Sequence, residues 1–245
     1  MMTPLEGWPK TRAPLPPEYQ RVYEAHMAIN RGGGSALNRA ALWLEEWMHR
    51  SVASPPANAV LELGAGSLNH VRFEPQATTY DVVEPLREVV EQSLPNTPHA
   101  IGYIGDYGAL LQKSTESRSV YDKVVSVAVL EHLDCLPVAI ASSALLLKPS
   151  GVFAAGIPSE GGRLWKWSWQ ATTGRAFKRR FGLDYSVLME YEHINSAHEI
   201  ESVLRHLFTD VSIRRFPGPS LETSIYTTLH ARNPRVDRAE AIAQV

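Results

Sequence analysis

Between residues 57 and 158, short apolar runs alternate with stretches of helical spacing, and this alternation is the strongest constraint on the fold. The intervening stretches with a helix-forming pattern are 85–93, 108–114 and 136–147. Strands that are apolar on both faces and alternate with helices predict a parallel sheet with helices on both sides. The runs of strand length are 58–63, 78–84, 100–105, 121–129 and 151–157.

The flanking regions do not follow this alternation. Two helices are expected before it, over 17–30 and 36–52, the second capped by Ser35. Residues 159–192 form an insertion rich in tryptophan and arginine, and a helix near 196–208 and strands at 211–216 and 223–231 follow. We predict an N-terminal extension with helices (1–56), a main domain (57–231) that carries the insertion, and a frayed polar tail (232–245).

Composition narrows the class of protein. The formal net charge of −2 argues against a protein whose main task is to bind nucleic acid. Cys135 is the only cysteine, so neither an intrachain disulfide nor a cysteine-based zinc site is expected. No segment resembles a signal peptide or offers the about 20 apolar residues of a membrane span. We expect a cytoplasmic protein.

The segment VLELGAGSLNH, residues 60–70, falls at the first strand-to-helix turn, where parallel α/β sheets bind ligands. Gly64 and Gly66 permit a positive φ and a close approach of a ligand to the main chain. A dinucleotide-binding turn needs a third glycine at the position of Asn69. Glu62 suits a cationic ligand better than a pyrophosphate.

Two more acids end the next two strands, Glu84 in YDVVEP and Asp106 in GDY. The carboxyl ends of parallel strands share one edge, so these acids and Glu62 are expected along one rim. Glu84 is placed to accept hydrogen bonds from both hydroxyls of a ribose. Each acid taken alone could equally be a solvated loop carboxylate.

With the glycine turn, the segments YDKVVSVAVLEH (121–132) and LLLKPSGVFAAGIP (145–158) resemble the small-molecule, type 11-like branch of the class I S-adenosylmethionine-dependent methyltransferases. Leu68 and Ser150 replace glycines of that pattern, and Glu62 replaces its commoner aspartate. The resemblance implies an α/β, Rossmann-like, doubly wound and mostly parallel seven-stranded sheet. This chain would add an N-terminal helical extension and a helical lid insertion.

The resemblance also implies a site for S-adenosyl-L-methionine, with S-adenosyl-L-homocysteine as product. The glycine turn and Glu62 would meet the methionine part, and Glu84 the ribose hydroxyls. Asp106 and Tyr107 would meet the adenine. Asn69 is the weakest candidate, because it can also satisfy backbone donors at a helix start. The predicted cofactor residues are Glu62, Gly64, Ala65, Gly66, Asn69, Glu84, Asp106 and Tyr107.

Methyl transfer from a sulfonium is an in-line displacement, so the enzyme aligns the acceptor, excludes water and deprotonates a hydroxyl acceptor. His132, after the fourth strand, is the first candidate base, and His193, at the exit of the insertion, is the second. His132 could instead pack at a helix start, hydrogen-bonded to Glu131 or to the backbone. No metal site is predicted.

Acceptor specificity is expected in the insertion. Trp165 and Trp169 share a helix face, and Arg175 opens a basic cluster. These residues could form a lid that stacks on a ring and holds an anionic group, contact a membrane surface, or fill a satellite core. Tyr19 and Tyr23 either close over the same mouth or pack on their own helix.

The sequence therefore predicts a methyltransferase for a small-molecule or glycan-type acceptor, with an anionic acceptor as one option. Transfer to oxygen is favoured, and nitrogen and carbon stay open. One rival is an NAD(P)-dependent oxidoreductase, which Asn69 disfavours. The other is a catalytically silent methyltransferase-like binding subunit, which the intact set of acids and glycines disfavours. Neither the acceptor nor the oligomeric state follows from the sequence.

Overall fold

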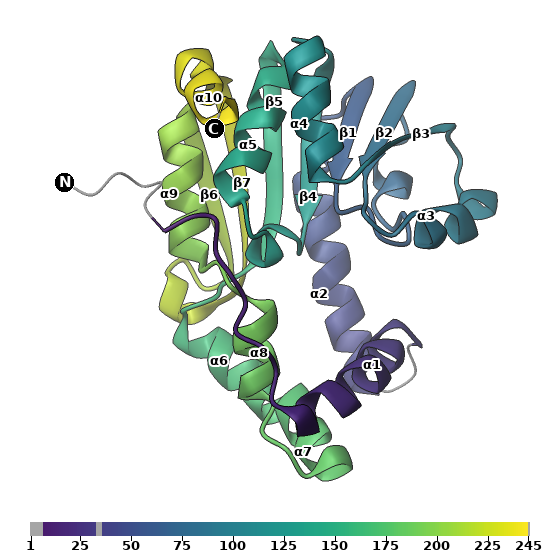
Figure 1. Cartoon of the computed structure of the whole chain (residues 1–245), viewed down its shortest axis with the longest axis vertical. Coiled ribbons are helices and arrows are strands. Elements are labelled where there is room, and N and C mark those ends of the chain that lie inside the picture. The colour runs from purple at the N-terminus through teal and green to yellow at the C-terminus, as the bar shows by residue number, and fades with distance from the viewer. Residues whose placement is uncertain (1–6, 33–35, 245) are drawn as a thin grey trace.

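In the computed structural model, which describes residues 7–32 and 36–244, seven strands form one sheet in the order β3-β2-β1-β4-β5-β7-β6 (Figure 1). The neighbours from β3 to β5 pair in parallel, and β7 runs antiparallel to both β5 and β6. The predicted α/β, doubly wound, mostly parallel sheet is confirmed. The strands are β1 Ala59–Leu63, β2 Thr79–Val83, β3 Ile101–Gly105, β4 Tyr121–Val127, β5 Leu147–Pro158, β6 Phe208–Pro217 and β7 Ser224–Pro234.

Helices cover both faces of the sheet, as a doubly wound sheet requires (Figure 1). One face is packed by α4 (Tyr107–Glu116), α5 (Leu136–Leu146), α9 (Ala197–Leu207) and α10 (Val236–Ala243). The other is packed by α2 (Ala36–Val52) and α3 (Arg87–Ser93). Because α5 lies between the sheet and its neighbouring helices, it is apolar all round and almost every one of its residues is buried.

The N-terminal extension and the insertion meet below the sheet in the view of Figure 1. The insertion comprises α6 (Arg163–Trp169), a π-helical turn (Gln170–Gly174), α7 (Arg175–Phe181) and α8 (Ser186–Glu192), and α1 (Pro17–Gly32) lies beside it. Buried residues of both regions form a satellite core. The predicted helical extension and helical insertion are thus observed. Ser35, the predicted N-cap of the second helix, lies outside the described residues. The buried members of this core are Leu15, Tyr19, Phe177 and Leu188.

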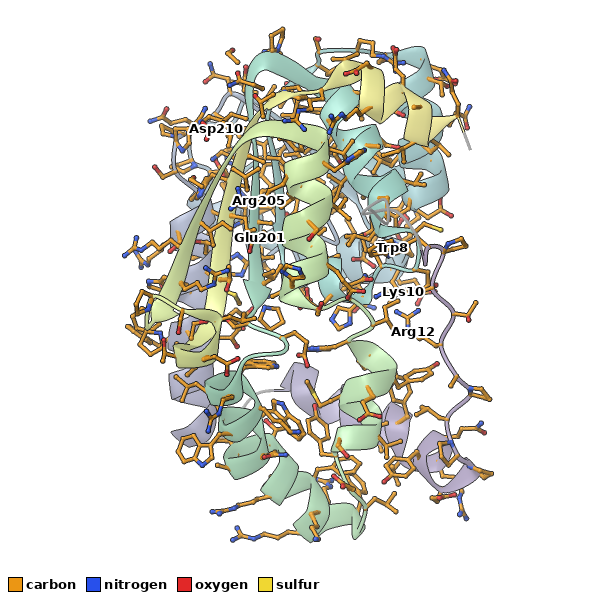
Figure 2. All side chains as sticks on the ribbon, turned by 90° about the vertical axis from the view of Figure 1, so that its left-hand side faces the viewer. Trp8, Lys10, Arg12, Glu201, Arg205 and Asp210 are labelled. Atoms are coloured by element: carbon orange, nitrogen blue, oxygen red, sulfur yellow. The ribbon has the colours of Figure 1, made fainter. Side chains whose placement is uncertain are left out.

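The segment ahead of α1 has no regular structure but is fixed to the main domain. Trp8, Lys10 and Arg12 lie along it beside α9 (Figure 2). The Trp8 indole donates to Asn195 Oδ1 at 3.1 Å, and Lys10 Nζ donates to Glu199 Oε1 at 2.6 Å. These contacts join residues more than 180 positions apart in the sequence.

The prediction of a frayed tail over 232–245 was wrong. Strand β7 continues to Pro234, and Val236–Ala243 form α10. Ala239 is fully buried and Ile242 is 8% exposed, both in the core that α5 shares. The charged residues of the helix, Asp237, Arg238 and Glu240, are exposed or half-buried on its outer face, so a charge-rich segment contained a short apolar stripe. The other proposed unit boundaries stay predictions.

None of the described helices combines the length and the apolar character that a membrane crossing needs.

Candidate functional site

The turn after β1 has the backbone geometry that its glycines indicated. Gly64 has φ +67°, and a Cβ added there would lie 2.4 Å from Val129 Cγ2, so glycine is needed for both conformation and packing. Gly66 has φ +49°, and a Cβ there would meet no heavy atom within 4 Å. Leu68, at the family's third glycine, also has a positive φ of 59°, and its side chain is buried in the core. Gly66 therefore presents accessible main chain.

Glu84 is the best-positioned carboxylate of the predicted cofactor set. Its Oε2 accepts from the Gly66 amide at 2.9 Å, and its Oε1 accepts from the Leu86 amide at 3.0 Å. The two donors fix the carboxylate against the glycine turn and leave each oxygen with a further lone pair. The Glu84 amide donates to the Gly105 carbonyl at 2.7 Å, which places Asp106 at the adjoining strand end.

The other two acids lie differently. Glu62 is 3% exposed and accepts from the Tyr80 hydroxyl at 2.7 Å, so it lies inside the edge of the sheet rather than on its rim. Burial raises the pKa of Glu62 to about 8, although the Tyr80 hydrogen bond lowers it. Asp106 caps α4, its Oδ1 accepting from the Ala109 amide at 2.9 Å. Tyr107 packs against the main core, and burial raises its pKa.

Three further residues lie in or near the turn and strand ends that carry the predicted cofactor residues, which we call the cofactor half of the edge. Ala65 is buried within the turn. Asn69 is exposed and lines a polar surface pocket with Gln92 and Asn96, a pocket to which none of the three acids contributes. Leu86, which the sequence analysis did not single out, is 53% exposed, and its amide donates to Glu84 Oε1. In the sequence, Leu86 is an apolar residue two positions after the strand-end acid Glu84, with Pro85 between them.

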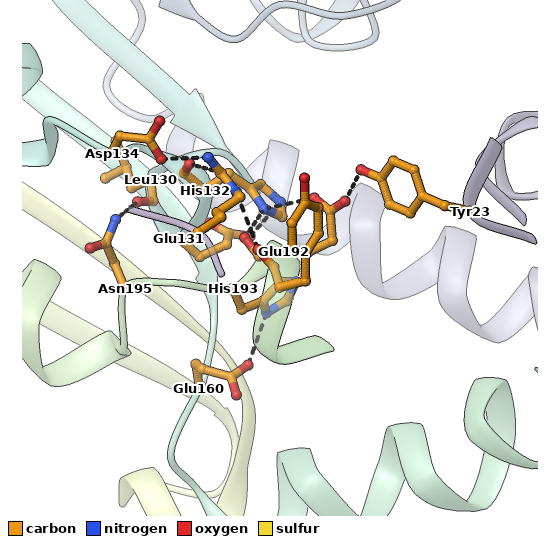
Figure 3. Close-up of polar contacts among 11 residues, drawn as sticks. Tyr23, Leu130, Glu131, His132, Asp134, Glu160, Glu192, His193 and Asn195 are labelled. Atoms are coloured by element: carbon orange, nitrogen blue, oxygen red, sulfur yellow. Dashed lines mark hydrogen bonds and ion pairs between the residues drawn. The ribbon is translucent and has the colours of Figure 1, made fainter. Parts of the chain in front are cut away.

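The two predicted bases lie after β4, in a region that we call the acceptor half of the edge. There His132 and His193 lie edge to face with ring centroids 5.0 Å apart (Figure 3). His132 Nδ1 donates to the Glu192 carbonyl at 2.8 Å, and His193 Nδ1 donates to Glu160 Oε2 at 2.9 Å. Glu131, 1% exposed, lies beside them with its Oε1 3.9 Å from His132 Nε2. Burial raises the pKa of Glu131 to about 7, against the lowering effect of His132.

The turn that carries Glu131 and His132 is held by the segment after α8. Asn195 Nδ2 donates to the carbonyls of Leu130 and Leu133 at 2.9 and 2.8 Å. The amides of Ile194 and Asn195 donate to the Glu131 carbonyl at 2.9 and 3.0 Å. The end of β4 and the exit of the insertion therefore form one hydrogen-bonded unit, with Asn195 at its centre.

Two of the predicted substrate residues reach this unit. The Trp165 indole donates to Glu160 Oε2 at 2.6 Å and stacks on His193 at 6.2 Å between centroids. The Tyr23 hydroxyl donates to Glu192, whose other carboxylate oxygen lies 3.6 Å from His132 Nδ1 (Figure 3). These contacts link the insertion and α1 to both histidines.

The other three predicted substrate residues lie apart from the histidines. Tyr19 is 7% exposed in the satellite core, and its hydroxyl accepts from the Asp184 amide at 3.1 Å, which supports the packing interpretation. Trp169 contacts Tyr185 edge to face, and Arg175 is exposed at the start of α7. Their roles toward an acceptor stay predictions.

Sequence reasoning missed the residues that orient the histidines. Glu160 follows the last parallel strand, and Glu192 and Asn195 flank His193. Glu131 was considered only as a partner of His132. The one feature of the sequence that could have indicated them is that acids and an amide lie next to both histidines. The segments are EH at 131–132 and EHIN at 192–195.

Neither a family model nor a curated protein matches the chain significantly. Solved structures do match. N-methyltransferase NodS from Bradyrhizobium japonicum WM9, in complex with S-adenosyl-L-homocysteine, is 19% identical with a TM-score of 0.56, over 89% of this chain and 99% of that one. Burkholderia thailandensis 1,6-didemethyltoxoflavin-N1-methyltransferase, with bound 1,6-didemethyltoxoflavin and S-adenosylhomocysteine, is 17% identical with a TM-score of 0.52, over 91% and 93%.

An O-methyltransferase family protein from Burkholderia thailandensis is 16% identical with a TM-score of 0.53, over 88% of this chain and 61% of that one. The similar structures thus include N- and O-methyltransferases, and they do not specify the atom that this chain would methylate. The resemblance drawn from the sequence is confirmed at the level of structure: the chain has the fold of the S-adenosylmethionine-dependent methyltransferases.

Proposed function

We propose that the chain binds S-adenosyl-L-methionine and transfers its methyl group to an oxygen of a small-molecule or glycan-type acceptor. The observation that carries the proposal is the clamp between Glu84 and Gly66: a buried carboxylate held by two amides, at a glycine where an added Cβ would meet no heavy atom within 4 Å. In this fold the clamp lies at the carboxyl edge, where ligands bind. Similar structures hold S-adenosylhomocysteine.

The chemistry of the cofactor half suits a cationic nucleoside. The free lone pairs of Glu84 would accept from the ribose hydroxyls, and Asp106 and exposed Leu86 would meet the adenine. Glu62 is buried behind the glycine turn, so of the three acids it is the one least able to contact the ammonium group directly. A pyrophosphate would instead meet the carboxylates of Glu84 and Asp106 with no neighbouring positive charge in this set, which disfavours a dinucleotide.

The acceptor half would supply proton transfer. His132 donates from Nδ1 to a carbonyl, so its neutral ring presents the Nε2 lone pair, which a base requires. The acceptor hydroxyl would give its proton to this nitrogen as the oxygen attacks the methyl carbon. The carbon–oxygen bond forms as the carbon–sulfur bond breaks, and the sulfur leaves as a neutral thioether. Trp165 and Tyr23 would border the acceptor.

Calorimetry with S-adenosylhomocysteine and, separately, with NAD tests the cofactor. We expect binding of the first alone, with about 2.7 kcal/mol of added stability at a concentration a hundred times the dissociation constant. A response to NAD alone would overturn the proposal. Methyl transfer from a radiolabelled donor to a panel of acceptors then separates an enzyme from a silent binding subunit.

A further inference from the structure

Three side chains of metal-ligand type converge after the end of β4 (Figure 3). Glu131, His132 and His193 each offer one ligand atom, and these atoms all lie within 4.8 Å of one another. Two ligand atoms on one tetrahedral Zn²⁺, each about 2.1 Å from the ion, lie about 3.4 Å apart. Small side-chain rotations would therefore bring all three into one coordination sphere.

The hydrogen bonds of the two rings fix which nitrogen is available. The Nδ1 atom of His132 faces a carbonyl and that of His193 faces a carboxylate, and both of these partners are acceptors. Each Nδ1 therefore carries the proton, and each neutral ring presents an Nε2 lone pair. Metal-binding histidines in proteins have this arrangement, with the other ring nitrogen donating to a carbonyl or a carboxylate.

Glu131 supplies an independent observation. It is 1% exposed, and its Oε2 is buried without a hydrogen-bond partner among the described residues. A buried carboxylate oxygen with no donor is costly, and most such atoms in proteins are satisfied. The other oxygen of this carboxylate, Oε1, lies 3.9 Å from His132 Nε2, so a cation that both carboxylate oxygens share beside the rings would satisfy Oε2.

The surroundings hold the three side chains in place, as a metal site requires. Asn195 clamps the turn that carries Glu131 and His132, and the stacked ring of Trp165 covers His193. Glu160 accepts from both Trp165 and His193. The ligands thus come from two segments about 60 residues apart that are already joined by hydrogen bonds.

We propose that Glu131, His132 and His193 bind one divalent transition-metal ion, of which Zn²⁺ is the probe of choice. Two imidazoles and one carboxylate suit Zn²⁺, Fe²⁺ or Co²⁺ better than Mg²⁺ or Ca²⁺. Three protein ligands leave a position open, and the partly exposed His132 leaves it an approach. This proposal rests on the proposed function and replaces its base: His132 Nε2 would bind the ion instead of taking the proton, and the open position would take the acceptor hydroxyl and promote loss of its proton to water. It revises the prediction that there is no metal site.

The first test titrates Zn²⁺ into the metal-stripped full chain. We expect one ion per chain, and Glu131→Gln and His193→Asn should each weaken binding more than the about 10- to 100-fold typical of outer-shell changes. Glu160→Gln, which alters the partner of His193, should fall within that range. Replacing exposed His198 on α9 by Gln is the matched control and should leave binding unchanged. Visible absorption of bound Co²⁺ should appear in the wild type and disappear in Glu131→Gln.

The proposal is overturned if the wild type does not bind Zn²⁺, or if both ligand variants bind it as tightly as the wild type. Retained S-adenosylhomocysteine binding shows that each variant is folded, and the two ligand variants lie in separate segments. If the wild type binds Zn²⁺ but not S-adenosylhomocysteine, the proposed function fails and the metal site stands. Methyl transfer that survives complete chelation would assign His132 as a base and contradict a metal at the acceptor.

Discussion

The two halves of the sheet edge are built differently. In the cofactor half, the Glu84 carboxylate is held by amides 2 and 18 positions away, and that of Asp106 by one 3 positions away. In the acceptor half, His132 pairs with a residue 60 positions away, Asn195 with one 65 away, and Tyr23 with one 169 away. The cofactor half is thus a local construction on the sheet, and the acceptor half is assembled from three distant segments.

The comparison predicts that the two halves can be disabled separately. His132→Ala should lower turnover by about 10²- to 10⁴-fold, the range for a lost acid or base, with S-adenosylhomocysteine affinity nearly unchanged. Initial rates with saturating donor, together with calorimetry, measure both quantities, and His198→Ala serves as the control. Full activity in the His132 variant, or a parallel loss of cofactor affinity, would remove the distinction.

The reverse experiment alters the cofactor half. Glu84→Ala should weaken S-adenosylhomocysteine binding by about 1.5 to 3 kcal/mol, because charge-assisted hydrogen bonds to the ribose are lost. Calorimetry checks this against Glu88→Ala, a change at an exposed acid on α3. Wild-type affinity in the Glu84 variant would mean that this carboxylate is not the ribose ligand.

The glycine turn offers a comparison within the cofactor half. Gly64→Ala and Gly66→Ala both place a side chain at a positive φ, but only the first meets Val129. Gly64→Ala should therefore be less stable than Gly66→Ala by about 1 to 3 kcal/mol, the usual cost of overpacking. Urea unfolding measures the difference. Equal unfolding midpoints of the two variants would contradict the role of Val129. For cofactor affinity the order should reverse: relative to its loss of stability, Gly66→Ala should lose more affinity for S-adenosylhomocysteine than Gly64→Ala does.

The smallest expected effect concerns Glu62. Its pKa is about 8 in the folded chain and ordinarily 4.5, so between these values the unfolded chain has released a proton that the folded chain keeps. The associated stability is complete below pH 4.5 and falls as the pH rises toward 8. From pH 6 to 7, Glu62→Gln should gain about 1.4 kcal/mol relative to the wild type. Urea unfolding at both pH values checks this, and parallel profiles would contradict it.

The same comparison explains how much could be predicted from sequence. The apolar runs from 58–63 to 151–157 predicted five strands because parallel strands buried on both faces need continuous apolar residues. The turn at Gly64 and Gly66 was predictable because backbone conformation selects the residue type locally. The inward position of Glu62 was not, because its partner Tyr80 lies on the neighbouring strand and pairing is not visible in a single sequence.

The acceptor half was the least predictable part of the chain. His132 and His193 could be chosen from their positions in the sequence. The contacts of Glu160 with His193 and of Asn195 with the Leu130 carbonyl could not, because they exist only where the end of the insertion packs against the end of β4. Tyr19 could be read as a binding residue or a packing residue, and the observation that supports packing, its burial against the insertion, depends on the fold and not on the local sequence. Helix α10 was missed for a similar reason. Its sequence contains several charged residues and only a short apolar stripe, and the packing of that stripe on distant parts of the chain is not visible in the sequence.

The irregular segment ahead of α1 has a practical consequence for anyone who modifies the beginning of this chain. Arg12 donates to the carbonyl of His132 and pairs with Asp134, and Trp8 supports Asn195 from behind. These few residues hold in place the loop that carries His132, the proposed base or metal ligand. Removing them, or fusing a bulky partner directly in front of them, should therefore disturb the proposed acceptor site, although the segment has no helix or strand of its own.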